Sequence, residues 1–275
     1  MEKTNNLVIQ TKNLKIRIDS NDTLINYGNL DIYEGDFVVL EGKNGSGKST
    51  FLKFLNDDGG DYCSKVGGEA FINGKEIGDY KTEQLRRQIV NINQEDLFIR
   101  NESTYHALMR PAINALYDLE NKMERKKQIK KWALDFYKDY LVGFFHKDKK
   151  EIDKYKNNPK TDLKFMYLCP VTRLSGGQQK MIHILQGIIK AKAINGNIIL
   201  MDEPLNNLDV ENKNKLRDLI KNLRENNPNI AIIMITHCRV FPNINKVIEI
   251  KEDGNEHIAR IVEFDGYYYD CLERR

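Results

Sequence analysis

The sequence has few cysteines, and they form no recognisable pattern. The four thiols, Cys63, Cys169, Cys238 and Cys271, lie far apart, and no two of them are separated by only two residues. Such spacing argues against a disulfide framework and against a cysteine-rich zinc site. We therefore expect free thiols and a reducing compartment, which is the cytosol.

Long hydrophobic runs are also lacking. No stretch approaches the roughly 18 consecutive apolar residues that a membrane-spanning helix requires. The longest candidates, Ile198–Met201 and Ile230–Ile235, have the length of buried strands. Residues 1–10 contain charge and asparagine where a signal peptide needs an apolar core, so no secretion signal is expected. If the protein serves a membrane process, another chain must supply the channel.

Charge of one sign is not in large excess. The 43 basic and 40 acidic residues leave a net charge of +3, too small to indicate nucleic acid binding, and no nucleic acid partner is expected. A basic run at residues 124–131 has two interpretations, a patch for nucleic acid or anionic lipid and a solvated helix face. Neighbouring apolar residues repeat at helical spacing, which favours the solvated face.

A glycine-rich loop, Gly42–Thr50, is the most informative stretch. It fits the pattern G-x-x-x-x-G-K-[ST], in which backbone N–H groups surround phosphates and a lysine and a hydroxyl complete the site. An apolar strand, Phe37–Leu40, precedes it and an apolar helix, Phe51–Leu55, follows, which places the phosphates at a helix N-terminus. This context favours a phosphate loop over an ordinary glycine turn. The residues predicted to bind the nucleotide here are Gly42, Asn44, Gly45, Ser46, Gly47, Lys48, Ser49 and Thr50.

Two carboxylates follow the apolar strand Ile198–Met201. Asp202 is placed to hold Mg²⁺ opposite Ser49, although aspartate at a strand end is also a common turn former. Glu203 can act as a general base on an attacking water, and the alternative is an exposed surface glutamate. The pair, in a chain that already has a phosphate loop, favours the catalytic interpretation.

Two further polar residues follow predicted strands. His237 can hydrogen-bond a γ-phosphate oxygen and the attacking water, whereas taken alone it is a capping or core histidine. Gln94 can offer its amide oxygen to Mg²⁺ or to the nucleophilic water, and its alternative is a polar loop residue. Both are therefore candidate catalytic residues.

A second anion-binding turn lies at Leu174–Gln178. The Ser175 hydroxyl and the Gly176 and Gly177 amides stand at a predicted helix start, before the apolar segment Met181–Ile189. One phosphate does not need two such sites in one subunit. We therefore predict a two-fold symmetric dimer, in which each subunit offers Ser175–Gln178 to the nucleotide held by the other.

The order of the predicted elements indicates an α/β fold. Strands and helices alternate from residue 174 onwards, which implies right-handed crossovers, a largely parallel sheet and helices on both faces. An antiparallel β subdomain is predicted from a hairpin (Leu7–Ile9 with Leu14–Ile18) and the strands Glu69–Lys75 and Ile89–Ile92. A helical subdomain is expected within residues 98–173, with residues 1–97 and 174–260 as the nucleotide-binding core and 261–275 as a tail. The 275 residues would form a single domain.

These motifs, in this order, resemble the ATP-binding cassette (ABC) family of ATPases over about residues 5–250. Gly42–Thr50 matches the Walker A loop, Gln94 the Q-loop, Leu174–Gln178 the LSGGQ signature, Ile198–Glu203 Walker B, Leu205–Asp209 the D-loop and His237 the switch histidine. The resemblance implies a P-loop NTPase (RecA-like) core, ATP and Mg²⁺ as cofactors, a nucleotide-sandwich dimer and Mg-dependent ATP hydrolysis. It also places Asp209 of the D-loop among the nucleotide-binding residues. It also implies a polytopic membrane permease as partner and a cytoplasmic, peripheral location on the inner face of the cell membrane.

Base recognition departs from the family pattern. Relatives usually stack adenine on an aromatic residue of the early hairpin, where this chain has Ile16 and Ile18, and Tyr27 lies too near the loop to be a clear substitute. The preference between ATP and GTP therefore stays open, as do the transported substrate, the direction of transport, and the role of the Lys-rich insert at residues 146–170. Whether the second nucleotide-binding subunit is a copy of this chain or a different chain also stays open. Two other functions remain: a soluble ABC ATPase acting on a protein or nucleic-acid complex, and a degenerate cassette, which the intact Glu203 and His237 oppose.

Overall fold

The structure, a computed structural model, describes residues 6–20, 22–56, 62–93, 98–99, 101–116, 121–142, 150, 153–154, 157, 168–206, 208–237, 241 and 243–262. The chain divides into two compact units. The first comprises Met1–Gln94, Asn197–Pro204 and Lys221–Arg275, and the second comprises Glu95–Gly196 and Leu205–Ile220. The subdomain boundaries at residues 98 and 173 stay a prediction.

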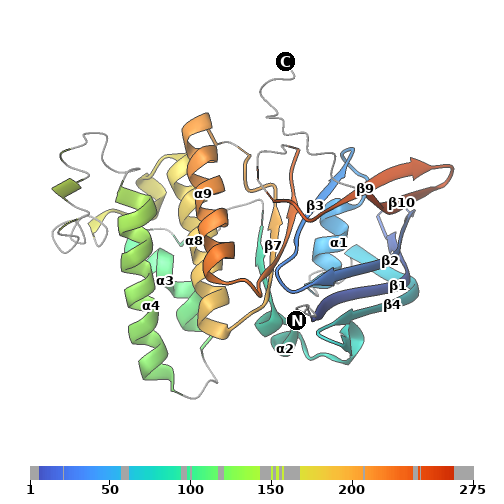
Figure 1. Ribbon diagram of the computed structural model, residues 1–275, viewed down its shortest axis with the longest axis horizontal. Coiled ribbons are helices and arrows are strands. Elements are labelled where there is room, and N and C mark those ends of the chain that lie inside the picture. Colours follow the sequence, from blue (N-terminus) through green and yellow to red (C-terminus); the bar gives the residue numbers. More distant parts are fainter. Residues whose placement is uncertain are drawn as a thin grey trace, which may run out of the picture. The chain divides into compact units, whose positions relative to one another are not determined.

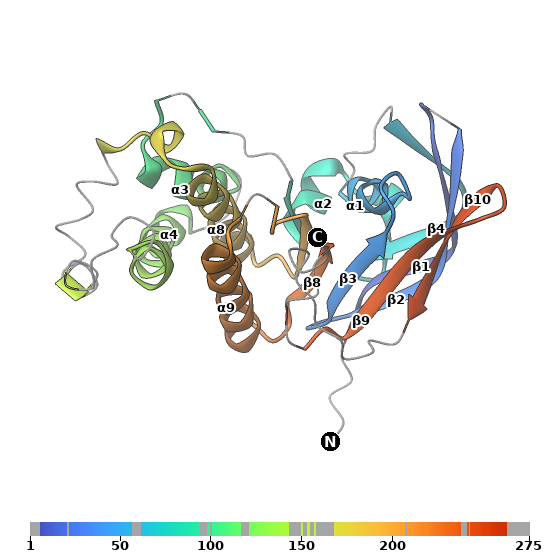
Figure 2. The same ribbon diagram turned by 90° about the horizontal axis from the view of Figure 1, so that it is seen from above.

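A ten-stranded sheet forms the first unit, with the strand order β5-β4-β1-β2-β10-β9-β3-β8-β7-β6. Its strands are β1 (Leu7–Ile18), β2 (Thr23–Tyr33), β3 (Phe37–Gly42), β4 (Cys63–Ile72), β5 (Lys75–Glu76), β6 (Ile89–Ile92), β7 (Ile198–Asp202), β8 (Ala231–Ile235), β9 (Lys246–Asp253) and β10 (Glu256–Val262). The helices α1 (Lys48–Leu55) and α2 (Thr82–Gln88) and the short 3₁₀ helix Ile77–Asp79 accompany it. Figures 1 and 2 show α1 beside β3, within the curve of the sheet.

The sheet has a parallel and an antiparallel half. Strands β9, β3, β8, β7 and β6 pair in parallel. Strands β2, β1, β4 and β5 pair antiparallel, and a parallel pairing of β10 with β2 joins the halves. The predicted α/β fold with a parallel core and an antiparallel β part is confirmed. β3, β7 and β8 are continuous apolar runs because both faces of a parallel sheet are buried, as the full burial of Val38, Leu200 and Ile233 shows.

The second unit is helical. It contains α3 (Thr104–Asn114), α4 (Lys122–Phe136), a π-helical turn (Tyr137–Leu141), a 3₁₀ helix (Val171–Arg173), α8 (Gly176–Ile194) and most of α9 (Val210–Asn226). The nearly all-round apolar character of α8 predicted its burial, and most of its side chains are inaccessible. The buried Gln186 of α8 donates its amide to the carbonyl of Ala107 on α3, so this polar side chain is satisfied within the helical unit.

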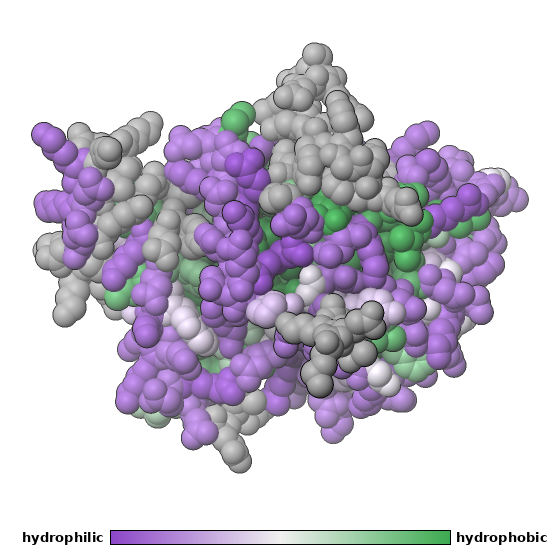
Figure 3. All heavy atoms as spheres, in the orientation of Figure 1, coloured by the Kyte–Doolittle hydropathy of each residue, from purple (hydrophilic) through white to green (hydrophobic). Residues whose placement is uncertain are grey.

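The basic run at residues 124–131 lies on α4. Only Ile129 and Ala133 of this helix are buried, and Glu124 pairs with Lys127 one turn later. The face of α4 seen in Figure 3 is hydrophilic. These features are typical of a solvated helix face, the interpretation that the sequence favoured.

The predicted early hairpin is wrong. Leu7–Ile18 is one 12-residue strand, β1, which pairs with β2 on one side and β4 on the other. Its register shifts between Thr11 and Leu14, and there the Thr11 hydroxyl donates to the carbonyl of Gly28 and accepts from the N–H of Leu30. The hydrophobic alternation is therefore broken between Thr11 and Leu14 by a bulge, and not by the turn that the sequence predicted.

Two other assignments change. Strand Ile89–Ile92 was predicted in the antiparallel part, but as β6 it pairs in parallel with β7 at the edge of the core. The hairpin of β9 and β10 was not predicted. Among the described cysteines, Cys63 and Cys169 are free, as expected. No helix in the described part of the chain has both the length and the apolar character needed to cross a bilayer.

Candidate active site

The phosphate loop begins where β3 ends and leads directly into α1. Gly42, Gly45 and Gly47 all have positive φ, at 149°, 81° and 105°. A Cβ atom at Gly42 would stand 2.5 Å from the Ile250 carbonyl oxygen, and one at Gly47 would stand 2.3 Å from Cδ1 of Ile25. All three positions therefore favour glycine by conformation, and Gly42 and Gly47 also require it by close approach. The sequence thus folds into an open turn lined with backbone N–H groups at the start of a helix.

Tyr27 supports this loop from inside the protein. Its hydroxyl donates to the carbonyl of Gly47 at 2.7 Å, and its ring stacks on Phe51 of α1 with centroids 4.6 Å apart. Complete burial raises the pKa of Tyr27 well above its usual value. Ile16 and Ile18 are buried as well. Because all three side chains are buried, none of them can present a face to a nucleotide base.

Lys48 is held within the loop. Its side chain is buried, and Nζ donates to the carbonyls of Gly42 at 2.8 Å and Lys43 at 2.9 Å. Burial lowers the pKa of Lys48, while the nearby carboxylates of Glu203 and Asp202 act in the opposite direction. The ammonium group is therefore positioned next to the loop amides, where it can bind phosphate oxygens.

Asp202 ends β7 beside Ser49 at the start of α1. Burial raises the pKa of Asp202, a hydrogen bond from the Ser49 hydroxyl lowers it, and the charge of Glu203 raises it further. One carboxylate oxygen, Oδ1, is buried without a hydrogen-bond partner among the described residues. An ionised carboxylate left partly unsatisfied beside a hydroxyl fits Mg²⁺, which takes few protein oxygens and completes its shell with phosphates and water. The residues present therefore fit the predicted metal.

Glu203 and His237 form a pair next to Asp202. Glu203 Oε1 lies 3.3 Å from His237 Nε2, and the glutamate side chain is 18% exposed against 45% for the histidine. The neighbouring parallel strands β7 and β8 end at the same edge, and the Glu203 N–H donates to the carbonyl of Ile235 at 3.0 Å. Glu203 has φ 47°, a conformation that is rare for a residue other than glycine, so its side-chain direction is imposed by the fold.

The turn Ser175–Gln178 belongs to the second unit. Ser175 is the N-cap of α8: its hydroxyl accepts from the N–H of Gln178, and the Gln178 side chain accepts from the N–H of Ser175 at 2.9 Å. Ser175 and Gly176 are exposed. The capping box accounts structurally for two of the four residues, while Gly176, where a Cβ would meet nothing within 4 Å, has no such requirement.

Asp209 plays a comparable local part, as its Oδ1 accepts from the N–H of Asn212 at 2.8 Å at the start of α9. Among the predicted site residues, the first unit thus brings together the phosphate loop, Asp202, Glu203 and His237, and the second holds Ser175–Gln178 and Asp209. Gln94 lies outside the described residues. The roles predicted for all these side chains remain predictions.

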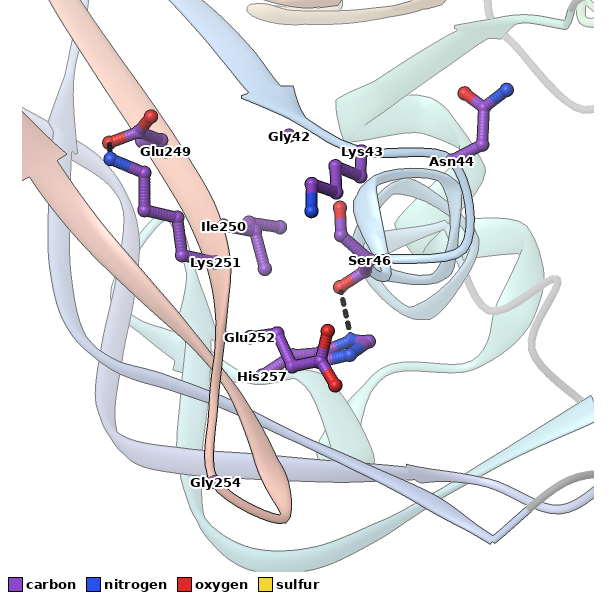
Figure 4. A pocket seen from close by; sticks show the side chains of 10 residues that line it. All are labelled: Gly42, Lys43, Asn44, Ser46, Glu249, Ile250, Lys251, Glu252, Gly254 and His257. Atoms are coloured by element: carbon purple, nitrogen blue, oxygen red, sulfur yellow. Dashed lines mark hydrogen bonds and ion pairs between the residues drawn. The ribbon is translucent and has the colours of Figure 1, made fainter.

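A pocket of about 700 Å³ lies next to the phosphate loop. Figure 4 shows Lys43, Asn44 and Ser46 of the loop on one side and the β9–β10 hairpin on the other, with His257 directed at Ser46. This hairpin was not predicted from the sequence. The signal was present, because Gly254-Asn255 between two strand-like segments is typical of a two-residue hairpin turn.

Comparison with known proteins agrees with this geometry. A family model described as "ABC transporter" matches residues 25–206. Macrolide export ATP-binding/permease protein MacB of Aggregatibacter actinomycetemcomitans is 29% identical over 81% of this chain, which spans 30% of that protein. Phosphate import ATP-binding protein PstB of Campylobacter jejuni is 28% identical, with 84% of this chain and 81% of that protein covered.

Solved structures show the same fold. The dimeric structure of a post-hydrolysis state of the ATP-binding cassette MJ0796, bound to ADP and Pi, superposes with a TM-score of 0.65 at 23% identity, covering 94% of this chain and all of that one. A bacterial Atm1-family ABC exporter with ATP bound gives 0.62 at 19% identity over 90% of this chain and 37% of that one. The predicted ABC resemblance is confirmed. The chain belongs to the ABC transporter family, and its fold is that of the ATP-binding cassettes among these solved structures.

Proposed function

We propose that this chain is the ATP-binding and ATP-hydrolysing subunit that powers an ABC transporter, as one half of a nucleotide-sandwich dimer docked on a separate membrane permease. The observation that carries the proposal is the Glu203–His237 pair, 3.3 Å apart, beside Asp202 and the phosphate loop. It is the arrangement that in-line attack of water on a γ-phosphate needs: an acceptor for the water proton and a second group to orient the reacting atoms.

The reaction follows from the positions of the side chains. The loop N–H groups and Lys48 Nζ bind the β- and γ-phosphates of ATP. Ser49 and Asp202 would hold Mg²⁺, with Gln94 as a third oxygen donor, and the ion when bound supplies positive charge that offsets the developing charge on the phosphates. Glu203 accepts the proton of the attacking water. His237, through Nε2, orients that water and the γ-phosphate, and its contact with Glu203 fixes the direction of the carboxylate.

A second subunit completes the site in this proposal. Ser175, Gly176 and Gly177 lie at the start of α8, where the Ser175 hydroxyl and unpaired helix amides favour an anion. Gln178 would support this turn and Asp209 would position the neighbouring loop. Support comes from the solved cassettes with the same fold, two of which are described as dimeric, one of them with ADP and Pi bound.

A membrane permease is the proposed partner, which places the subunit on the cytoplasmic face of the membrane. The relatives are described as ATP-binding proteins for import and as ATP-binding/permease proteins. This chain spans about a third of the length of the MacB proteins it matches.

Glu203→Gln tests the chemistry. The amide preserves shape and the hydrogen-bonding distance to His237 but cannot accept the water proton. We expect phosphate release to fall by about 100-fold or more, with ATP affinity retained and an ATP-bound dimer accumulating in size-exclusion chromatography. Glu211→Gln, at an exposed position of α9, is the control. Turnover near the wild-type rate in Glu203→Gln would remove Glu203 from its role.

Purification of the full chain from its native cells tests the partner. A polytopic membrane protein recovered in stoichiometric amount, and ATP hydrolysis stimulated in its presence, is the expected result. Recovery with ribosomes, DNA or a soluble scaffold instead would show a soluble ABC ATPase and contradict the transport function.

A further inference from the structure

The phosphate loop of this chain opens into a pocket whose far wall is a β-hairpin. Gly42, Lys43, Asn44 and Ser46 form one wall, and residues 249–252, Gly254 and His257 form the other. Its volume of about 700 Å³ falls within the range of about 300–1,000 Å³ that is usual for small-molecule sites. A ligand whose phosphates lie against the loop amides therefore has its remaining part next to a cavity of suitable size.

Ser46 provides an independent indication that a ligand belongs here. The residue lines the pocket and is only 4% exposed, yet its hydroxyl has no hydrogen-bond partner among the described residues. An unsatisfied buried hydroxyl costs free energy, which a polar ligand atom would recover.

His257 is the ring nearest to the loop in this pocket. Nδ1 lies 3.2 Å from the carbonyl oxygen of Ser46. Because a carbonyl oxygen only accepts, Nδ1 carries the proton, and this hydrogen bond fixes the plane of the ring (Figure 4). The strand pairing of His257 with Ile25 of β2 and Glu252 of β9 holds its backbone from both sides. An oriented imidazole is a suitable surface for a flat aromatic base.

We propose that the base and ribose of the nucleotide occupy this pocket, with the purine stacked on His257. This assignment rests on the proposed ATPase function, and it supplies the stacking group that Tyr27, Ile16 and Ile18 cannot provide because they are buried. Asn44 and Glu252 stand at the pocket wall and can hydrogen-bond the ribose hydroxyls. The hairpin of β9 and β10 thus acts as the base-recognition element of this chain.

The test compares two ligands by titration calorimetry on the full chain with Mg²⁺ present: ATP, and inorganic tripolyphosphate, which has the phosphates without base or ribose. The ratio of their affinities measures the contribution of the pocket. Two variants separate the roles of His257. His257→Gln keeps a donor for the Ser46 carbonyl and removes the ring, and His257→Phe keeps a ring and removes the donor.

We expect His257→Gln to lower the ATP-to-tripolyphosphate affinity ratio about tenfold, in line with base stacking, and His257→Phe to keep it within about threefold. Asp253→Asn, on the same hairpin but outside the pocket lining, should leave the ratio unchanged. The assignment would be overturned if His257→Gln left the ATP-to-tripolyphosphate affinity ratio unchanged, or if it weakened the binding of both ligands equally. It would also be overturned if His257→Gln bound ATP normally while His257→Phe bound it more weakly. Tripolyphosphate binding that persists in those cases leaves the phosphate site standing, whereas a wild-type chain that binds neither ligand refutes the proposed function itself.

Discussion

Asp202 is a partly buried carboxyl, and burial disfavours its ionised form. Burial raises the pKa of this carboxyl, and only one of its oxygens is hydrogen-bonded among the described residues. A carboxyl with a raised pKa in the folded state holds its proton more tightly there than in the unfolded chain. At low pH the protonated carboxyl therefore stabilises the folded state. This stability is lost as the pH rises through the folded-state pKa, and at neutral pH the buried, ionised carboxylate destabilises the folded state.

Asp202→Asn is expected to make the nucleotide-free chain more stable, because it removes that buried charge while keeping an acceptor for Ser49. In the presence of a chelator the melting temperature at pH 7 should rise by a degree or more, whereas Mg²⁺-dependent ATP hydrolysis should be lost. Asp218→Asn, whose side chain is 64% exposed, serves as control and should change neither quantity. A lower melting temperature for Asp202→Asn would show that the charge is well compensated.

Tyr27→Phe removes the hydroxyl that donates to the Gly47 carbonyl. The Gly47 carbonyl would keep the hydrogen bond from the N–H of Phe51 but lose this second, buried donor, so the free energy of unfolding should fall by about 1 kcal/mol. ATP affinity should fall severalfold as the loop loses its support. Chemical denaturation and calorimetry measure the two effects. Tyr62→Phe, at an exposed tyrosine whose ring contact with Lys53 is retained, is the matched control. Unchanged stability in Tyr27→Phe would assign the loop geometry to its glycines alone.

At the residue scale, the sequence located the site but not its supports. The phosphate loop with Lys48, and the side chains of Asp202 and His237, could be predicted because each comes shortly after an apolar run that must be a buried strand, and strand ends of a parallel sheet share an edge. Tyr27 was harder, since an aromatic near the loop can face either a ligand or the core. The burial of Ile25 and Tyr27 on the same face of β2 decides this, and only the pairing of β2 reveals that face.

At the scale of one element, the N-terminus of α8 is exposed although its own residues cap it. The cap formed by Ser175 and Gln178 meets the local requirement, so the two glycines between them need another explanation. At Gly176 a Cβ would enter open space, whereas at Gly177 it would stand 2.9 Å from the side chain of Asn212.

Gly176→Ala should therefore leave the stability of the isolated chain unchanged or slightly higher, since alanine favours a helix over glycine by up to about 1 kcal/mol. Its methyl group would stand on the surface proposed to face the partner subunit's nucleotide, and we expect ATP turnover to fall by about tenfold or more. Thermal melting and phosphate release measure both. Gly78→Ala, another exposed glycine with open space around its Cβ position, is the control. Full activity in Gly176→Ala would contradict the shared site.

Elements with strong apolar runs were predicted well, and those shaped by pairing were not. β3, β7, β8, α8 and α9 follow from local patterns alone. The bulge in β1 depends on the Thr11 side chain, which takes the place of a backbone group in the hydrogen bonding to β2. The position of β6 in the sheet depends on its pairing with β7. These pairings involve segments that are far apart in the sequence, so they cannot be predicted from the pattern of any one short segment.

The proposed catalytic unit of the whole molecule is two chains. The first unit supplies the phosphate loop, Asp202, Glu203 and His237, and the Ser175–Gln178 turn would act on a second copy's nucleotide. ATP turnover per subunit should then rise with protein concentration across the dimerisation range, and the Hill coefficient for ATP should exceed one. Phosphate-release assays at several protein concentrations measure the turnover per subunit, and analytical ultracentrifugation of the same samples measures the oligomeric state. Constant turnover per subunit in a demonstrably monomeric sample would contradict the shared site.

The position of β3 in the sheet has a consequence for synthesis on the ribosome. Val39 is paired with Met234 of β8 on one side and Val247 of β9 on the other, so the strand that carries the phosphate loop pairs with two strands that are translated much later than itself. Translation delivers the loop early, but its backbone hydrogen bonds wait until almost the last described residues have left the exit tunnel. A nascent chain would hence acquire nucleotide binding late and abruptly, which keeps incomplete cassettes from engaging ATP.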